Sequence, residues 1–339
     1  MPQEYVEDAI DQFITTQMES QHIPGLSLAI VCGDEVVRAR GYGFASLELN
    51  VAVTPETVFQ IGSITKQFTA TAVMMLVAEG KVSLDESITG YQEGLPAVWG
   101  AVTVRHLLAH TSGIKSFTNI PDVTERLTFL PTTRDEILAL IAKERLEFAP
   151  GERYAYNNTG YYLLGHIIEK ASGQRYADFL QERIFAPLGM EATRVNDMDD
   201  IIPYRASGYV WAENRWWNAR HISMTWAFSA GALASTVHDL ARWGAALGRD
   251  ALLPKASWEW MWTPTTLTDG TKTGYGLGWR MIDYSGHRSV GHDGTSSGFT
   301  AFVERDLEDG LMVIILTNVV PSNRAEIARG VVDHYVAGL

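Results

Sequence analysis

Cysteine is almost missing from this chain. Its 339 residues include a single cysteine, Cys32. One thiol cannot close an internal disulfide, and it cannot supply the several thiolates of a structural zinc site or an iron–sulfur cluster. Cys32 ends the apolar run LSLAIVC, which is typical of a buried strand. We therefore interpret it as a packing residue and not as a nucleophile.

Long apolar runs and an excess of positive charge are missing as well. No stretch reaches the roughly 18 apolar residues that a membrane-spanning helix needs. The sequence has 27 Lys and Arg against 40 Asp and Glu, a formal net charge of -13 at pH 7. This charge repels polyanions, so we expect neither nucleic acid nor an anionic membrane surface as a partner.

The first residues of the chain do not resemble a targeting signal. The segment MPQEYVEDAIDQF is acidic and amphipathic, whereas a signal peptide has a basic start and an apolar core. On this basis we expect a cytoplasmic protein, or a periplasmic or secreted one if a leader was removed before residue 1.

Strand signals lie near both ends of the chain, and helical periodicity fills the middle. An amphipathic helix over residues 3–20 precedes two apolar strands joined at Gly33–Asp34. Four further strand signals occur between residues 274 and 318, and an amphipathic helix follows them. The most economical arrangement is one antiparallel sheet built from both ends, flanked by the N- and C-terminal helices.

This pattern predicts an α/β fold with an inserted, mainly helical lobe. We place the sheet lobe at residues 1–62 and 270–339, and the helical lobe at residues 63–269. A functional site is then expected in the cleft where the two lobes meet.

Ser63 and Lys66 stand three residues apart at the head of the apolar run GSITKQFTATAVMM. In a helix the two side chains share a face, one turn apart. Serine is also a common helix N-cap, and this pair alone favours that interpretation. A lysine inside an apolar helix, however, is costly unless its charge is paired or used.

Two more motifs follow in the sequence, Tyr156-x-Asn158 before a helix and His292-x-Gly294 at the end of a strand. Together with Ser63-x-x-Lys66, they make the chain similar to the serine β-lactamase and penicillin-binding protein superfamily. The nearest branch holds class C β-lactamases, D-amino-acid peptidases and the β-lactamase-like (family VIII) carboxylesterases. The resemblance covers nearly the whole chain and extends to the flanking segments LLAHTSG, FAPGERYAYNNTGYYLLG and YGLGW.

The resemblance implies a β-lactamase/transpeptidase-like fold and a serine hydrolase that works through an acyl-enzyme, with no cofactor and no metal. Ser63 would be the nucleophile, activated by Lys66 and Tyr156 acting as a unit. The sequence does not separate these two candidates for the base. Asn158 would hold Lys66 and the acyl part of the substrate.

The third motif has two implied roles. The backbone N–H groups of Ser63 and of Thr295, which follows Gly294, would form the oxyanion hole. His292 stands where many lactamases carry a lysine, and an imidazole is largely neutral at pH 7. An acidic protein with an aromatic-rich middle suits a neutral, apolar acyl ester better than an anion.

We therefore predict a carboxylesterase acting on a small-molecule ester or amide. The alternatives within the same class are a β-lactamase, a DD-peptidase or a D-amino-acid peptidase. From another class, the chain could be a non-catalytic relative that binds peptidoglycan or serves as a scaffold.

Three other patterns have simpler interpretations. Lys272 heads a Lys-Thr-Gly triad, but it lies in a polar turn before the third motif, and we interpret it as solvated. Ser296 sits in a Gly-x-Ser-x-Gly pattern that lacks the following helix of a nucleophile elbow, so we expect a structural role. His106 and His110 are four apart without the glutamate of a zinc-protease motif, which favours packing, with His110 near a tight turn.

Overall fold

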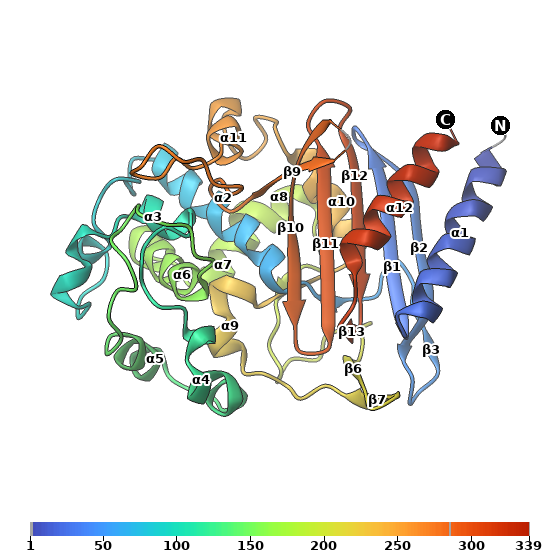
Figure 1. Cartoon of the computed structure of the whole chain (residues 1–339), viewed down its shortest axis with the longest axis horizontal. Coiled ribbons are helices and arrows are strands. Elements are labelled where there is room, and N and C mark those ends of the chain that lie inside the picture. Colours follow the sequence, from blue (N-terminus) through green and yellow to red (C-terminus); the bar gives the residue numbers. More distant parts are fainter. Residues whose placement is uncertain (1–2, 285, 339) are drawn as a thin grey trace.

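The computed structural model describes residues 3–284 and 286–338. Its main element is a seven-stranded antiparallel sheet that combines the two ends of the chain, in the order β3-β2-β1-β12-β11-β10-β9. Figure 1 shows the blue N-terminal strands beside the red C-terminal ones. The strands are β1 (Gly25–Cys32), β2 (Glu35–Ser46), β3 (Val51–Ala52), β9 (Arg280–Tyr284), β10 (His287–Ser296), β11 (Phe299–Asp306) and β12 (Leu311–Thr317).

β1 lies inside the sheet, where Leu28 pairs with Arg40 of β2 on one side and Ile315 of β12 on the other. Seven of its eight residues are buried, as its continuous apolar sequence predicts for a central strand. The eighth residue is Cys32, which is exposed. The prediction of a buried cysteine was wrong because the strand reaches the solvent one residue earlier than the apolar run ends.

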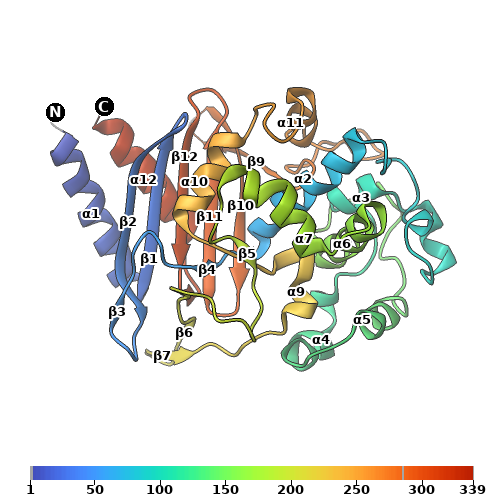
Figure 2. The same cartoon turned by 180° about the vertical axis from the view of Figure 1, so that it is seen from behind.

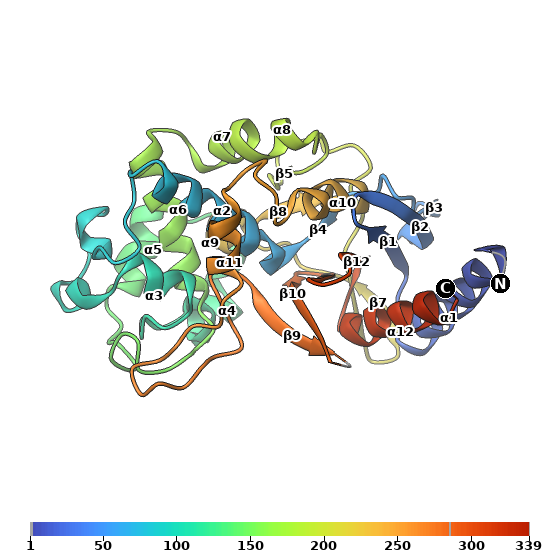
Figure 3. The ribbon, with the colours of Figure 1, turned by 90° about the horizontal axis from the view of Figure 1, so that it is seen from above.

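Helices cover both faces of this sheet. α1 (Gln3–Ser20) and α12 (Arg324–Ala337) pack against each other, and α12 contacts β11 and β12 on one face. α10 (Val237–Ala246) contacts β1 and β12 on the opposite face. Figure 3 shows the sheet between these two layers, and Figure 2 shows α10 over the sheet from behind. The flanking terminal helices are as predicted, while α10 comes from the inserted segment.

The helical lobe is built around α2 (Thr65–Ala78). A single 3-10 turn at Gly62–Ile64 leads into this helix. Residues 65–76 of α2 are all buried, in agreement with a helix that is apolar on most faces. The other helices are α3 (Val104–Leu108), α4 (Pro121–Glu125), α5 (Arg134–Ile141), α6 (Asn158–Ser172), α7 (Tyr176–Leu180), α8 (Ala186–Leu188), α9 (Met224–Gly231) and α11 (Lys255–Met261). The short strands are β4 (Phe59–Gln60), β5 (Arg194–Val195), β6 (Tyr209–Ala212), β7 (Arg215–Asn218), β8 (Leu233–Ser235) and β13 (Val319–Val320).

The segment GYGLGWRMI forms a strand only from Arg280 onward. Gly278 has a φ of +88°, and a Cβ placed there would lie 2.5 Å from the Ala70 Cβ of α2. The preceding glycines thus let a buried turn lie directly on the central helix, where a straight strand would collide with it. None of the helices in the described residues has the length and hydropathy required to cross a bilayer.

Candidate active site

Ser63 lies in the 3-10 turn that leads into α2. The N-cap interpretation is wrong: Ile61 and Ile64 hold the cap positions of the turn and the helix, and neither cap has a side-chain hydrogen bond. The Ser63 Oγ instead accepts a hydrogen bond of 3.0 Å from the Nζ of Lys66. The two residues therefore form the pair that their three-residue spacing predicts.

Lys66 is completely buried. Its Nζ donates to three oxygens, at 3.0 Å to Ser63 Oγ, 2.8 Å to Asn158 Oδ1 and 2.7 Å to the carbonyl of Ala230 in α9. Burial lowers the pKa of Lys66 well below its usual range, and the nearby Arg280 guanidinium lowers it further, although Asp293 opposes the shift.

The three partners of Lys66 determine how its neutral amine must point. A carbonyl oxygen and an amide oxygen can only accept hydrogen bonds, whereas a hydroxyl can also donate one. When Lys66 is neutral, its two N–H groups are therefore directed to Asn158 and Ala230. Its lone pair then faces Ser63, the one partner of the three with a hydrogen to give.

Tyr156 lies on the loop before α6, and its hydroxyl is close enough to Ser63 for the serine side chain to lower the pKa of the phenol. Burial raises the pKa of Tyr156 far above its usual value, and the Ser63 contact offsets this only in part. The Lys66 Nζ lies 4.8 Å from the centre of the tyrosine ring. Tyr156 is thus a neutral phenol beside the serine hydroxyl, and a phenolate would be strongly disfavoured there.

The two asparagines at the start of α6 have different roles, because one caps the helix and the other binds Lys66. Asn157 is the N-cap, and its side chain accepts from the N–H of Gly160 at 2.9 Å. Asn158 is the first helical residue; its Oδ1 accepts from Lys66 at 2.8 Å and its Nδ2 donates to the Thr118 hydroxyl at 3.2 Å. The cap fixes the helix, and the helix positions the amide that holds the lysine.

His292 on β10 is fully buried beside this group, with both ring nitrogens in use. Its Nδ1 lies 2.6 Å from the carbonyl of Asp293, which can only accept, so Nδ1 carries the proton. Its Nε2 then accepts from the Tyr275 hydroxyl at 2.8 Å. Burial lowers the pKa of His292 far below its usual value. His292 is a neutral residue that supports the strand, with no free nitrogen for a substrate carboxylate.

Glycines bring β10 against the start of the turn that carries Ser63. A Cβ at Gly294 would lie 2.0 Å from the Ile61 carbonyl oxygen, and one at Gly62 would lie 2.7 Å from the Thr295 nitrogen. Real Cβ contacts do not occur at such distances, so only glycine permits this approach. The backbones of Ser63 and Thr295 are thereby neighbours, as the predicted oxyanion hole requires.

Three charged residues at this site were not identified from the sequence. The carboxylate of Asp293 lies 2.7 Å from the Arg280 Nε and 2.7 Å from the Arg324 Nη2. The Arg280 guanidinium is also 5.5 Å from the centre of the Tyr156 ring. Asp293 is the middle residue of the His292-x-Gly294 motif, and Arg280 directly follows the segment YGLGW. Both residues therefore lie within or next to segments that were identified from the sequence. Nothing in the local sequence indicated Arg324.

The three simpler interpretations agree with the structure. Lys272 lies in an exposed loop. The Ser296 hydroxyl donates to the Gln60 side chain at 2.6 Å, and strand β11 follows it instead of a helix. His106 accepts the backbone N–H of Thr103 at 3.2 Å in a capping box at the start of α3.

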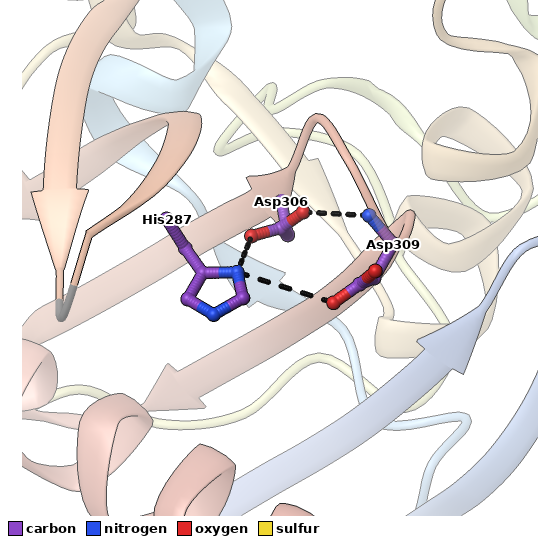
Figure 4. A group of neighbouring side chains, drawn as sticks. All are labelled: His287, Asp306 and Asp309. Atoms are coloured by element: carbon purple, nitrogen blue, oxygen red, sulfur yellow. Dashed lines mark hydrogen bonds and ion pairs between the residues drawn. The ribbon is translucent and has the colours of Figure 1, made fainter.

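A separate polar group contains the first residue of β10, His287, together with Asp306 and Asp309 (Figure 4). The Nδ1 of His287 is 3.2 Å from a carboxylate oxygen of Asp306 and 3.9 Å from one of Asp309. His287 and Asp309 are exposed, and the three residues join two neighbouring hairpin turns at the surface. These three residues make no contact with the side chains described around Ser63.

Comparison with known proteins identifies the family. The family model described as Beta-lactamase matches residues 10–337. The chain belongs to the Beta-lactamase family. It is 30% identical over 315 residues to penicillin-binding protein 4* of Bacillus subtilis, covering 88% of this chain and 69% of that protein. It is 28% identical over 316 residues to the D-aminopeptidase of Brucella canis, covering 91% of this chain but only 59% of the D-aminopeptidase.

Solved structures of this family show the same fold. The octameric penicillin-binding protein homologue from Pyrococcus abyssi aligns with a TM-score of 0.83 at 31% identity, over 97% of this chain and 77% of that one. The D-amino acid amidase from Ochrobactrum anthropi SV3, in complex with D-phenylalanine, aligns with a TM-score of 0.86 at 26% identity, over 98% and 99% of the two chains. The predicted β-lactamase/transpeptidase-like fold is confirmed, and the chain is a hydrolase of the serine type.

Proposed function

We propose that this protein hydrolyses amides and short peptides of D-amino acids through an acyl-enzyme on Ser63. The observation that carries the proposal is the hydrogen-bond set of Lys66, which directs the lone pair of a neutral amine at the Ser63 hydroxyl. Lys66 takes the Ser63 proton while the Oγ attacks the substrate carbonyl. The N–H groups of Ser63 and Thr295 stabilise the oxyanion that forms.

Tyr156 supplies the proton that an amide leaving group needs. An amine departs as a neutral molecule only if its nitrogen is protonated, whereas an alkoxide or phenolate leaving group depends much less on an acid. The neutral Tyr156 hydroxyl beside Ser63 gives its proton to the leaving amine, and the proton held by Lys66 restores it. Water then attacks the acyl-enzyme by the reverse sequence of transfers, which releases the acid product and regenerates Ser63.

One argument for a carboxylesterase was the largely neutral His292 in the third motif, which offers no fixed cation to an anionic substrate. The Arg280 side chain supplies a cation beside this motif, and 39% of it is exposed. Two guanidinium groups share the single Asp293 carboxylate, so the group carries a net positive charge. The names of the relatives support the same change, because a D-aminopeptidase and a D-amino acid amidase are among the proteins most similar to this chain.

Arg280 provides a test of which end of the substrate is recognised. Arg280→Ala should lower kcat/KM roughly tenfold or more for a D-dipeptide with a free carboxylate, because its charge is at the rim of the site. The matching C-terminal amide should change less than about threefold. Arg288, an exposed arginine on the same hairpin, gives the control variant Arg288→Ala, which should leave both substrates unaffected. Equal losses on both peptides would show that Arg280 does not recognise the carboxylate.

Carboxylester hydrolysis is the second candidate, favoured by the buried, neutral His292 in the third motif. The two activities are separated by comparing D-alanine p-nitroanilide, L-alanine p-nitroanilide, p-nitrophenyl butyrate and nitrocefin under identical conditions. We expect the D-anilide to have the highest kcat/KM and the L-anilide to be at least about tenfold slower. A preference for the butyrate ester over both anilides after correction for leaving-group reactivity would replace the first candidate with the second.

A further inference from the structure

His110 is a fully buried histidine that the proposed chemistry does not use directly. It follows α3 and has a φ of +58°, in the left-handed region. Its ring centre lies 4.3 Å from that of Tyr156 and 4.7 Å from that of Tyr275. The imidazole therefore packs directly against the tyrosine whose hydroxyl lies beside Ser63.

His110 anchors the chain on both sides of Tyr156. The N–H of Asn157 donates to its Nδ1 at 3.0 Å, and the N–H of Ala155 donates to its backbone carbonyl at 2.9 Å. One residue thus accepts the hydrogen bonds from the residues before and after Tyr156. A backbone N–H inside the protein is costly to leave without an acceptor, so these two hydrogen bonds hold the loop in one position.

The anchor works only when His110 is neutral. Its Nδ1 accepts a hydrogen bond, so the ring proton is on Nε2, which has no hydrogen-bond partner among the described residues. Burial lowers the pKa of His110 well below its usual range, and the nearby Lys66 and His292 lower it further. A charged imidazole would lose the Asn157 contact and would face the catalytic lysine.

We propose that His110 is a positioning residue, which holds the Tyr156 hydroxyl on Ser63 by fixing the backbone on both sides of that tyrosine. This inference rests on the proposed function, because it requires Tyr156 to transfer the proton. His110 does not touch the substrate in this scheme. It sets the distance over which the proton moves, so its loss should lower kcat and leave KM nearly unchanged.

Two variants separate the anchor from simple packing. His110→Leu fills the space and keeps the backbone carbonyl that binds Ala155, but it offers no side-chain acceptor to the N–H of Asn157. We expect kcat to fall about 100-fold with KM within about threefold. His110→Asn can place its Oδ1 where the Nδ1 stood, and asparagine tolerates the positive φ, so it should recover to within about tenfold of the original kcat. The readouts are kcat and KM on D-alanine p-nitroanilide, with Tm recorded for each variant.

The decisive measurement repeats His110→Leu in a Tyr156→Phe background. If His110 acts through the tyrosine hydroxyl, the second substitution should cost less than about threefold. A further loss of about 100-fold, or equal kcat for the Leu and Asn variants, would overturn the inference and leave the proposed function intact. Full activity of Tyr156→Phe alone would overturn the inference and, in addition, the role of Tyr156 in the proposed function.

Discussion

Ser63→Ala should reduce hydrolysis by at least about 10⁴-fold, a change of roughly 5.5 kcal/mol in the barrier. The variant removes the oxygen that forms the acyl-enzyme, and a serine nucleophile cannot be replaced by a methyl group. Its fold should persist, because Lys66 keeps its bonds to Asn158 and Ala230. The measurements are the burst of p-nitrophenol and the mass of the intact protein after reaction with a fluorophosphonate.

Ser296→Ala is the matched control for Ser63→Ala. Ser296 lies in the Gly-x-Ser-x-Gly pattern, but its hydroxyl is bound to Gln60, so this variant should keep both activity and labelling. Loss of labelling in Ser296→Ala, with Ser63→Ala unaffected, would contradict the assignment. A native protein that labels at no serine would instead support the non-catalytic alternative.

Lys66→Ala and Tyr156→Phe should each lower kcat/KM by about 10³-fold or more, and the double variant should lose little beyond that. Lys66 is hydrogen-bonded to the Ser63 hydroxyl and Tyr156 lies beside it, so in the proposed mechanism one receives its proton and the other passes a proton on. Removing either residue interrupts the same proton-transfer pathway, so a second substitution should lower kcat/KM little further. The measurement is a double-mutant cycle on an anilide, and multiplying losses would contradict the shared route.

The pH profile of the native enzyme distinguishes the two candidates for the base. Lys66 must be unprotonated to act, and burial lowers its pKa well below its usual range. The rate should therefore rise with pH through this lowered pKa and stay level above it, where the amine remains neutral. Tyr156, whose pKa is raised by burial, should stay protonated over the same range. A rate that rises only near the usual pKa of lysine or tyrosine would contradict Lys66 as the resting base.

Several features could be predicted because they depend on neighbours in the sequence. The apolar run after Ser63 predicts a buried helix, and α2 is one, since any helix with such a sequence must exclude water on most faces. The hairpin at Gly33–Asp34 and the strands β10 to β12 follow from short-range patterns of the same kind. Ser63 and Lys66 meet because helical geometry alone brings residues three apart together.

Other features depend on residues that meet only in the folded chain. The direction of the Lys66 lone pair depends on the Ala230 carbonyl, which is 164 residues away in the sequence. No local sequence pattern predicts this contact. The cation that changes the expected substrate comes from Arg280 on β9, and its carboxylate partner Asp293 also binds Arg324 at the start of α12.

The sequence by itself therefore determined the family, the sheet built from both ends and the residues that we propose for catalysis, because motif order and periodicity are properties of the chain. Only the tertiary structure showed the contacts and charges around those residues, on which the proposal of Lys66 as the base depends. Protonation depends on burial and on nearby charges. For Lys66, His110 and His292, these are supplied by elements far apart in the sequence.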